Sequence, residues 1–184
     1  SWKNFLSTGN VKTVVQLDRS PSTVITGENG AGKSTILDAL TLGLFGKPFR
    51  NIKKQQLINT INDKGLEVEI KFSIGSTNYL VRRGMKPHCF EIFKNGNLID
   101  QPGSVRDYQL YLETQILKLN YKSFTQIVIL GNASFTPFMQ LSTRDRREVI
   151  EDLLDIQIFS TMNMLLRDRN SDNKRSLTDI NYNI

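Results

Sequence analysis

The sequence contains few of the residues that build disulfides and zinc sites. Its 184 residues include one cysteine, Cys89, and one histidine. A single cysteine cannot form an internal disulfide, and one cysteine with one histidine supplies too few ligands for a tetrahedral zinc site. We therefore expect structural rather than catalytic roles for both residues.

Long hydrophobic runs are also absent. The longest purely aliphatic run is Ile127 to Leu130, whereas a helix that crosses a bilayer needs about 20 mostly apolar residues. The first residues lack the basic-then-apolar pattern of a signal peptide. The sequence thus predicts no membrane association and a cytoplasmic location, which is the host cell cytoplasm if the protein is viral.

Acidic residues are outnumbered by basic ones. The chain has 24 Lys and Arg against 18 Asp and Glu, which gives a formal net charge of +6. Such an excess favours polyanionic partners, either a nucleotide or a nucleic acid. With 39% hydrophobic residues, a chain of this length is expected to form one domain with a sizeable core and an appendage.

Residues 27–35, with the sequence GENGAGKST, match the phosphate-binding pattern G-x-x-x-x-G-K-S/T. A short segment that we predict to be a strand, Thr23 to Thr26, precedes them, and a helical pattern follows. The glycines allow a tight turn whose N–H groups point inward, Lys33 adds a positive charge, and Ser34 offers a hydroxyl to Mg²⁺. The dipole of the following helix favours the same anion. We therefore predict a nucleotide site.

Period-two alternation predicts several strands. The cleanest covers residues 66–74, where apolar residues alternate with Glu67, Glu69, Lys71 and Ser73. Asn95-Gly96 is a strong signal for a two-residue hairpin turn. These patterns predict an antiparallel β meander with strands at residues 66–74, 79–83 and 90–94, and two separate strands earlier in the chain, at residues 1–5 and 11–17.

A helical period predicts the remaining elements. The first helix should bury Ile36, Leu37, Leu40 and Leu44 and end at Gly46. A second is expected from Ser104 to Leu117, whereas residues 121–130 fit a helix or a strand equally. Ser142, with Asp145 three residues later, predicts a helix start, and we expect this helix to bury Val149, Ile150, Leu153 and Leu154.

The last residues differ from the rest of the chain. From about Gln157 the sequence has no glycine or proline and keeps a helical apolar seam. A helix of this length extends roughly 40 Å, and its polar middle predicts that it needs a partner helix. We therefore divide the chain into a lobe at residues 1–156 and the start of a coiled-coil stalk at residues 157–184.

Two parts of a complete ATP-hydrolysing site are missing from the sequence. Hydrolysis needs a carboxylate that binds the metal and another that activates water, usually at the end of a hydrophobic strand. The chain has no run of four aliphatic residues followed by acidic residues, and no glycine-rich signature such as L-S-G-G. We expect the chain alone to bind nucleotide without hydrolysing it.

Several segments together resemble one family. The segments GENGAGKST, LDAL, GLFGKPFR, SFTQIVILGNASFTPFMQL and RREVIEDLLDI are similar to the N-terminal ATPase lobe of SMC-like double-strand-break repair ATPases. Among these, they most resemble the ATPase of the bacteriophage recombination endonuclease and bacterial SbcC. The resemblance implies an α/β P-loop NTPase fold, namely the N-terminal lobe of an ABC/SMC-type head with a mixed sheet, an antiparallel meander and the start of a coiled-coil helix.

The same resemblance implies partners. In this family a C-terminal ATPase lobe supplies the acidic strand and the signature motif, and two heads enclose two ATP molecules between them. A metal-dependent nuclease and double-stranded DNA complete the assembly. The missing parts of the site would then lie in the C-terminal lobe.

The resemblance also assigns site residues. It implies that ATP and Mg²⁺ are bound by Asn29, Gly30, Ala31, Gly32, Lys33, Ser34 and Thr35, with Lys33 catalytic and Ser34 on the metal. The glutamine of the family's Q-loop aligns with Asn132, which is therefore expected to be both catalytic and metal-linked. Asparagine is one methylene shorter than glutamine, so its amide is expected to contact the metal through a bridging water. Many members have an arginine at Leu6, and Arg50, Lys53 or Lys54 could replace it.

Two other functions remain as alternatives, a stand-alone P-loop NTPase or kinase and a non-catalytic DNA-binding fragment. The guanine-binding pattern N-K-x-D is absent, which weakens the GTPase alternative. If the chain meets duplex DNA, basic residues of the meander and of the stalk base are the expected contacts, namely Arg82, Arg83, Lys86, Arg167 and Arg169.

Overall fold

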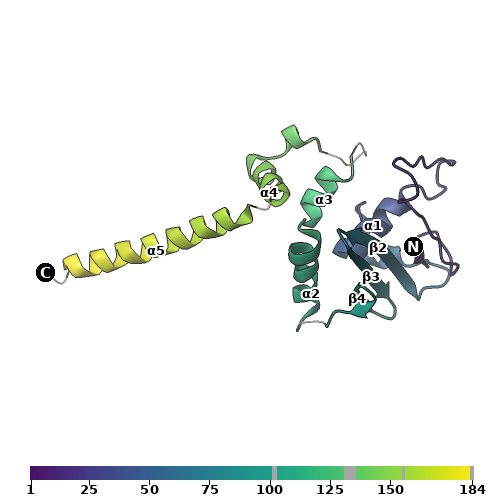
Figure 1. Ribbon diagram of the computed structural model, residues 1–184, viewed down its shortest axis with the longest axis horizontal. Coiled ribbons are helices and arrows are strands. Elements are labelled where there is room, and N and C mark those ends of the chain that lie inside the picture. The colour runs from purple at the N-terminus through teal and green to yellow at the C-terminus, as the bar shows by residue number, and fades with distance from the viewer. Residues whose placement is uncertain (101–102, 131–135, 155, 183–184) are drawn as a thin grey trace. The chain divides into compact units, whose positions relative to one another are not determined.

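The computed structural model describes residues 1–100, 103–130, 136–154 and 156–182. The chain forms two compact units, which we consider separately (Figure 1). Unit 1 contains Ser1–Leu117, and unit 2 contains the described parts of Lys118–Leu130 and Phe135–Ile184. This division differs from the predicted boundary between lobe and stalk after residue 156, which stays a prediction.

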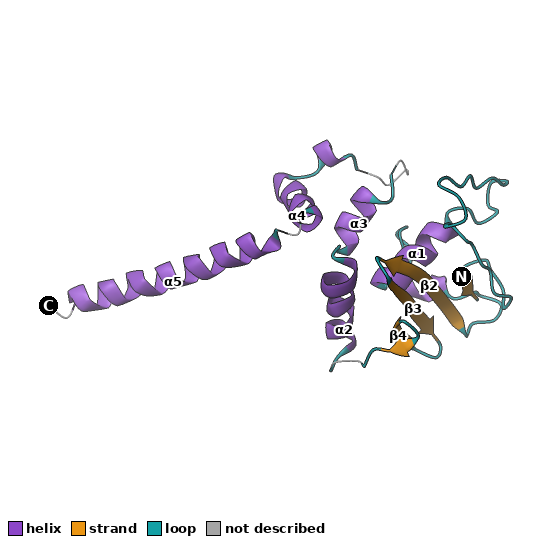
Figure 2. Cartoon of the chain, in the orientation of Figure 1, coloured by secondary structure: helices purple, strands orange, loops and turns teal. Residues whose placement is uncertain are grey.

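Unit 1 is built on a five-stranded sheet in the order β1-β2-β3-β4-β5 (Figure 2). Every pairing among the described strands is antiparallel, so the meander is confirmed, and the mixed sheet is not found in the described part of the chain. Asn95 and Gly96 both have positive φ, as the predicted hairpin turn requires. The strands are Trp2–Lys3, Leu66–Ile74, Thr77–Met85, Cys89–Lys94 and Asn97–Leu98.

One face of this sheet packs on helix α1, Thr35–Phe45. Val68, Val81 and Ile92 are fully buried. The helix approaches β2 closely at Gly43, because a Cβ atom there would lie 2.5 Å from Cγ1 of Ile70. The small residue at position 43 thus sets the distance between the helix and the sheet.

The buried face of α1 differs from the predicted stripe. Leu44 is buried as expected, but Ile36, Leu37 and Leu40 are only half-buried. The helix instead faces the sheet with a side that includes small residues. A side chain at Gly43 would clash with Ile70 at this distance. Its most buried residues include Thr35, Asp38, Ala39, Thr41, Leu42 and Phe45.

Two predicted strands are wrong. The segment Val11 to Leu17 contributes a single bridge, in which Trp2 and Thr13 exchange backbone hydrogen bonds of 2.9 and 2.8 Å. The segment Thr23 to Thr26 has no regular secondary structure and is exposed, and no strand in the described part of the chain pairs with it. Alternation alone does not make a strand, because the backbone groups need a neighbouring strand as partner.

The predicted helix from Ser104 to Leu117 is confirmed. It comprises α2, Val105–Tyr111, and a π-helical turn, Leu112–Leu117. Ser104 begins it with a capping box that includes Asp107. The hydroxyl of Tyr108 accepts a hydrogen bond from Ile92 N at 3.0 Å and donates one to Ile99 O at 2.7 Å. The helix is thereby fixed to β4.

Unit 2 is helical. The ambiguous segment forms α3, Tyr121–Ile127, which is followed by α4, Thr143–Leu153, and α5, Gln157–Tyr182. The long final helix is confirmed, and the hydroxyl of Ser142 accepts from Asp145 N at 3.1 Å, as predicted. Short 3-10 turns lie at Lys54–Leu57 in unit 1 and Phe138–Gln140 in unit 2. None of the helices in the described chain has the length and hydrophobicity of a membrane span.

The predicted inner face of α4 is mostly wrong. Val149 is buried, but Ile150, Leu153 and Leu154 are exposed. Polar contacts decide the orientation of the helix. Buried Ser123 of α3 donates a hydrogen bond to buried Asp152 of α4, and Lys122 pairs with Asp145 and Glu148.

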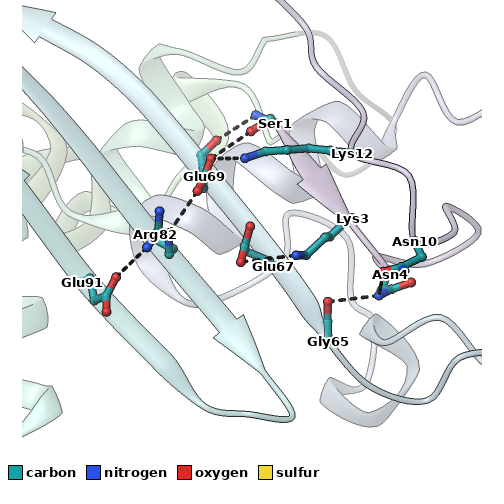
Figure 3. A network of polar contacts seen from close by, with 10 residues as sticks. All are labelled: Ser1, Lys3, Asn4, Asn10, Lys12, Gly65, Glu67, Glu69, Arg82 and Glu91. Atoms are coloured by element: carbon teal, nitrogen blue, oxygen red, sulfur yellow. Dashed lines mark hydrogen bonds and ion pairs between the residues drawn. The ribbon is translucent and has the colours of Figure 1, made fainter.

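The outer face of the sheet has a row of alternating charges (Figure 3). Glu69 of β2 accepts from Lys12 and, at 3.0 Å, from Nε of Arg82 on β3. Nη1 of Arg82 reaches Glu91 of β4 at 3.1 Å. Glu69 lies on the polar face of β2, yet only 7% of it is exposed, because Lys12 and Arg82 both contact its carboxylate. Burial raises the pKa of its carboxyl, but these hydrogen bonds outweigh burial and hold the pKa below its ordinary value.

We expect Glu69→Gln to lower the free energy of unfolding at pH 7 by about 1–3 kcal/mol, since charged hydrogen bonds are lost. Because the folded pKa of Glu69 is depressed, its stabilisation is complete above the unfolded pKa of about 4.3 and is lost as the pH falls through the folded value. The variant should therefore lose less stability than the wild type between about pH 5 and pH 3. Urea unfolding at both pH values measures this difference.

Glu67→Gln is the matched control. Glu67 lies on the same strand and pairs with Lys3 at 3.6 Å, but both side chains are about one-third exposed. Such a pair contributes about 0–1 kcal/mol. An unchanged acid dependence in Glu69→Gln would contradict the role given to this row of charges.

Candidate functional site

The loop that matches the phosphate pattern runs directly into α1. Gly30 and Gly32 have φ of 87° and 94°, values that glycine adopts without the strain that a side chain would bring. The N–H of Ala31 donates to Glu28 O at 3.2 Å, and that of Thr35 donates to Gly32 O at 3.0 Å. The sequence thus forms the tight turn that was predicted for it.

Lys33 is folded back over this loop. Its ammonium donates to the carbonyl oxygens of Gly27 at 2.6 Å and Glu28 at 2.7 Å. A lysine ammonium has three donors, so one remains to contact an anion. The positive charge of Lys33 therefore lies beside the loop. The positive end of the α1 helix dipole is at the same place.

The donors of the loop suit a polyphosphate better than a bare metal ion. Ser34 is exposed at the start of α1, and its hydroxyl forms no capping bond to the helix. In the described part of the chain, no group of three or more His, Cys, Asp or Glu residues could hold a metal. A Mg²⁺ ion at Ser34 would therefore take its other ligands from phosphate and water, as Mg²⁺ commonly does.

An ion pair between a buried carboxylate of α1 and an exposed arginine lies close to the loop. Asp38 is in the first turn of α1 and is fully buried. Its carboxylate accepts from the backbone N–H of Arg50 at 2.9 Å and from Nε of Arg50 at 2.7 Å. The guanidinium of Arg50 is thus committed to Asp38, which argues against its use as a substitute phosphate contact. Lys53 and Lys54 remain exposed.

The basic residues of the meander are largely engaged within unit 1. Arg83 points to the inner face, where Nε donates to Gly43 O at 3.1 Å and Nη2 donates to Gln109 at 2.6 Å. Its guanidinium lies 3.7 Å from the centre of the Phe90 ring. Burial lowers the pKa of Arg83 to about 10, although Glu113 acts in the opposite direction. Arg83 is therefore held by contacts within unit 1, and its contact with duplex DNA stays a prediction.

The other two predicted DNA contacts of the meander also have partners. Arg82 is held by Glu69 and Glu91, and Lys86 pairs with Asp63 at 2.8 Å. In contrast, Arg167 and Arg169 lie on the exposed helix α5. Any DNA surface on this chain is therefore better supported on α5 than on the meander.

The motif predicted the turn that precedes α1, but sequence reasoning missed residues that hold α1. Gly43 O and Leu44 O, in its last turn, accept from Arg83 and from Nε2 of Gln109. The sequence signal for Arg83 was its position two residues after buried Val81 in a strand, which places both on the same face. Asn132 lies outside the described residues, so its predicted role is not addressed by the geometry.

Comparison with known proteins agrees with the motif. The chain is 48% identical over 164 residues to exonuclease subunit 2 of Enterobacteria phage T4, covering 89% of this chain and 29% of that protein. It is 26% identical to the SbcC component of the nuclease SbcCD of Lactococcus lactis, over 85% of this chain and 17% of that protein. It is also 26% identical to the DNA double-strand break repair Rad50 ATPase of Thermoplasma acidophilum, over 86% of this chain and 18% of that protein.

These matches confirm the resemblance found in the sequence. The chain spans less than a third of the length of these relatives. A family model described as an AAA domain matches residues 1–182, almost the whole chain. A match of that extent, with a phosphate loop that opens a helix at the expected position, shows that the chain belongs to the AAA domain family.

Proposed function

We propose that residues 27–35 bind ATP with Mg²⁺ and that the chain is the N-terminal ATPase lobe of a DNA-repair ATPase similar to Rad50 and SbcC. The observation that carries this proposal is the position of Lys33, whose ammonium lies over a glycine turn at the start of α1. Such a site attracts the terminal phosphates through the lysine, the backbone N–H groups and the helix dipole together.

Each residue of the loop has a defined role in this proposal. Lys33 contacts the terminal phosphates, and Ser34 supplies the hydroxyl for Mg²⁺. The backbone from Asn29 to Gly32 surrounds the phosphates, and Thr35, which is buried at the start of α1, completes the contacts to the nucleotide. Bound Mg²⁺ would neutralise charge on the phosphates. The test is direct binding of ATP, with and without Lys33, as set out in the Discussion.

For Asn132 we expect opposite results from two substitutions in the complete head. Asn132→Gln should retain ATPase activity, because it keeps the amide that links metal and phosphate by way of water. Asn132→Ala should lose most of the activity. Steady-state phosphate release measures both, and equal rates for alanine and the wild type would show that this position has no metal-linked role.

The proposed partners follow from the relatives. One relative is named as part of an exonuclease and another as part of a nuclease, so we propose a metal-dependent nuclease as partner. We also propose the chain's own C-terminal lobe, a second head bound in the presence of ATP, and duplex DNA, in the cytoplasm of the cell or of the host. DNA affinity that did not fall with added salt would contradict a phosphate-contacting surface.

The exposed apolar residues of α5 support a partner for the stalk. They recur at helical spacing in the first part of this helix and again near its end, separated by a polar stretch, namely Ile158, Met162, Leu165, Leu166, Leu177 and Ile180. A helix that exposes such a seam gains stability when a second helix covers it. We propose that this second helix is the antiparallel partner of α5 in a coiled coil and comes from a later part of the protein. A single, unpaired α5 in a structure of the full-length protein would contradict this.

A further inference from the structure

The feature that the proposed nucleotide site leaves unexplained is a fully buried carboxylate beside it. Asp38 lies one helical turn beyond Ser34, and its N–H donates to Ser34 O at 3.2 Å. Its side chain has 0% exposure. One turn of a helix rises 5.4 Å, so a negative charge is located close to the loop that is proposed to bind a highly negative ligand.

Arg50 neutralises this charge at close range. It donates from its backbone N and from Nε at 2.9 and 2.7 Å, and its Nη2 lies 2.6 Å from Oδ2 of Asp38. The side chain of Arg50 remains 45% exposed, so the pair is still in contact with solvent through Arg50. The carboxylate is thus engaged by both the main chain and the side chain of the same residue.

A charge in this position affects anion binding. Coulomb energy falls only as the inverse of distance and is weakly screened in a protein interior. An uncompensated Asp38 would oppose both the helix dipole and Lys33, which attract phosphate from the same side. With Arg50 in place, the pair is neutral and the N-terminus of α1 keeps its attraction for anions.

We infer that Arg50 is a positioning residue of the proposed nucleotide site, and that it acts by neutralising Asp38 and holding it against the first turn of α1. This inference rests on the proposed binding of ATP at residues 27–35. The affinity for nucleotide then depends on Arg50, although Arg50 does not touch the nucleotide. The competing explanation is that Arg50 only fixes the chain after α1, without an electrostatic effect on the site.

A charge-neutral double variant separates the two explanations. In the full-length protein, Arg50→Met should weaken ATP binding about tenfold, because it leaves a buried charge near the phosphates. Asp38→Asn combined with Arg50→Met should restore affinity to within about twofold of the wild type, since no net charge remains. If both variants bind equally weakly, geometry alone explains Arg50 and the electrostatic inference is wrong.

Two further variants complete the experiment. Lys64→Met removes the same charge from an exposed lysine of unit 1 that has no proposed role at the site, and it should change affinity less than twofold. Asp38→Asn alone leaves Arg50 unopposed and should tighten ATP binding severalfold, a test that holds even if Arg50→Met fails to fold. Unchanged or weaker binding in Asp38→Asn would overturn the inference.

The outcomes also distinguish the inference from the function on which it rests. Isothermal calorimetry with Mg²⁺ and ATP gives the dissociation constants, and thermal unfolding confirms that each variant is folded. If the wild type binds ATP and Arg50→Met binds equally well, only the inference fails. If the wild type does not bind ATP, the proposed function fails, and the role of Arg50 fails with it.

Discussion

Lys33→Ala is expected to lower the affinity for ATP tenfold to hundredfold. Charge-assisted hydrogen bonds to phosphate contribute about 1.5–3 kcal/mol each, which corresponds to that range. The substitution also removes the two bonds by which Lys33 closes the loop onto Gly27 and Glu28. Both effects weaken the site, so calorimetry at a fixed Mg²⁺ concentration should show a clear loss.

A matched control distinguishes the loss of a contact in the loop from the loss of one positive charge elsewhere on the chain. Lys64 is an exposed lysine of unit 1, and Lys64→Ala removes the same charge at a position outside the loop. We expect its affinity for ATP to be close to that of the wild type. Unchanged affinity in Lys33→Ala, with the fold preserved in a thermal melt, would remove residues 27–35 as the nucleotide site.

The second large effect concerns turnover. The 184-residue chain alone is expected to bind ATP but to release no phosphate above background. Positioning and charge stabilisation supply nearly all of phosphoryl-transfer catalysis, and the sequence provides the phosphate loop without an acidic strand or a glycine-rich signature motif. Addition of a separately expressed C-terminal lobe should restore turnover.

A steady-state phosphate-release assay decides this point. It compares the chain alone, the chain with the C-terminal lobe, and the same mixture with Lys33→Ala. Activity is expected only in the unsubstituted mixture. Robust turnover by the chain alone, lost on Lys33→Ala, would contradict the division of the active site between two lobes and would favour a self-contained P-loop enzyme.

Local patterns predicted the meander and most helix starts. Residues 66–74 form β2 without a shift of either end, and Asn95-Gly96 forms the expected turn, because alternation and turn chemistry are properties of short segments. The caps at Ser104 and Ser142 are local in the same sense. The phosphate loop was also recognisable, since its glycines and lysine are contiguous.

Contacts between distant residues decided what could not be predicted. The segment Thr23 to Thr26 has strand-like residues but no neighbouring strand in the described chain. The orientation of α1 depends on the fit of Gly43 against Ile70, and that of α4 on the bond from Ser123 to Asp152. None of these partners can be read from a period of apolar residues.

In the candidate site, too, local patterns could be predicted and contacts between distant residues could not. Lys33 and Ser34 were identified from the motif, whereas the engagement of Arg50 by Asp38 required the fold, because twelve residues separate the two. An arginine in a basic segment has the same sequence pattern whether it faces a ligand or a buried carboxylate. Only the burial of Asp38 distinguishes the two.

Amide-proton NMR of the chain during a titration with Mg²⁺ and ATP tests the central claim most directly. Binding at the loop predicts that the largest shifts belong to the amides of residues 27–35, and that Lys33→Ala needs about tenfold to hundredfold more ATP to produce them. Binding that leaves these amides unmoved while others shift, or no shift at all at millimolar ATP, would contradict the claim that this loop is the nucleotide site.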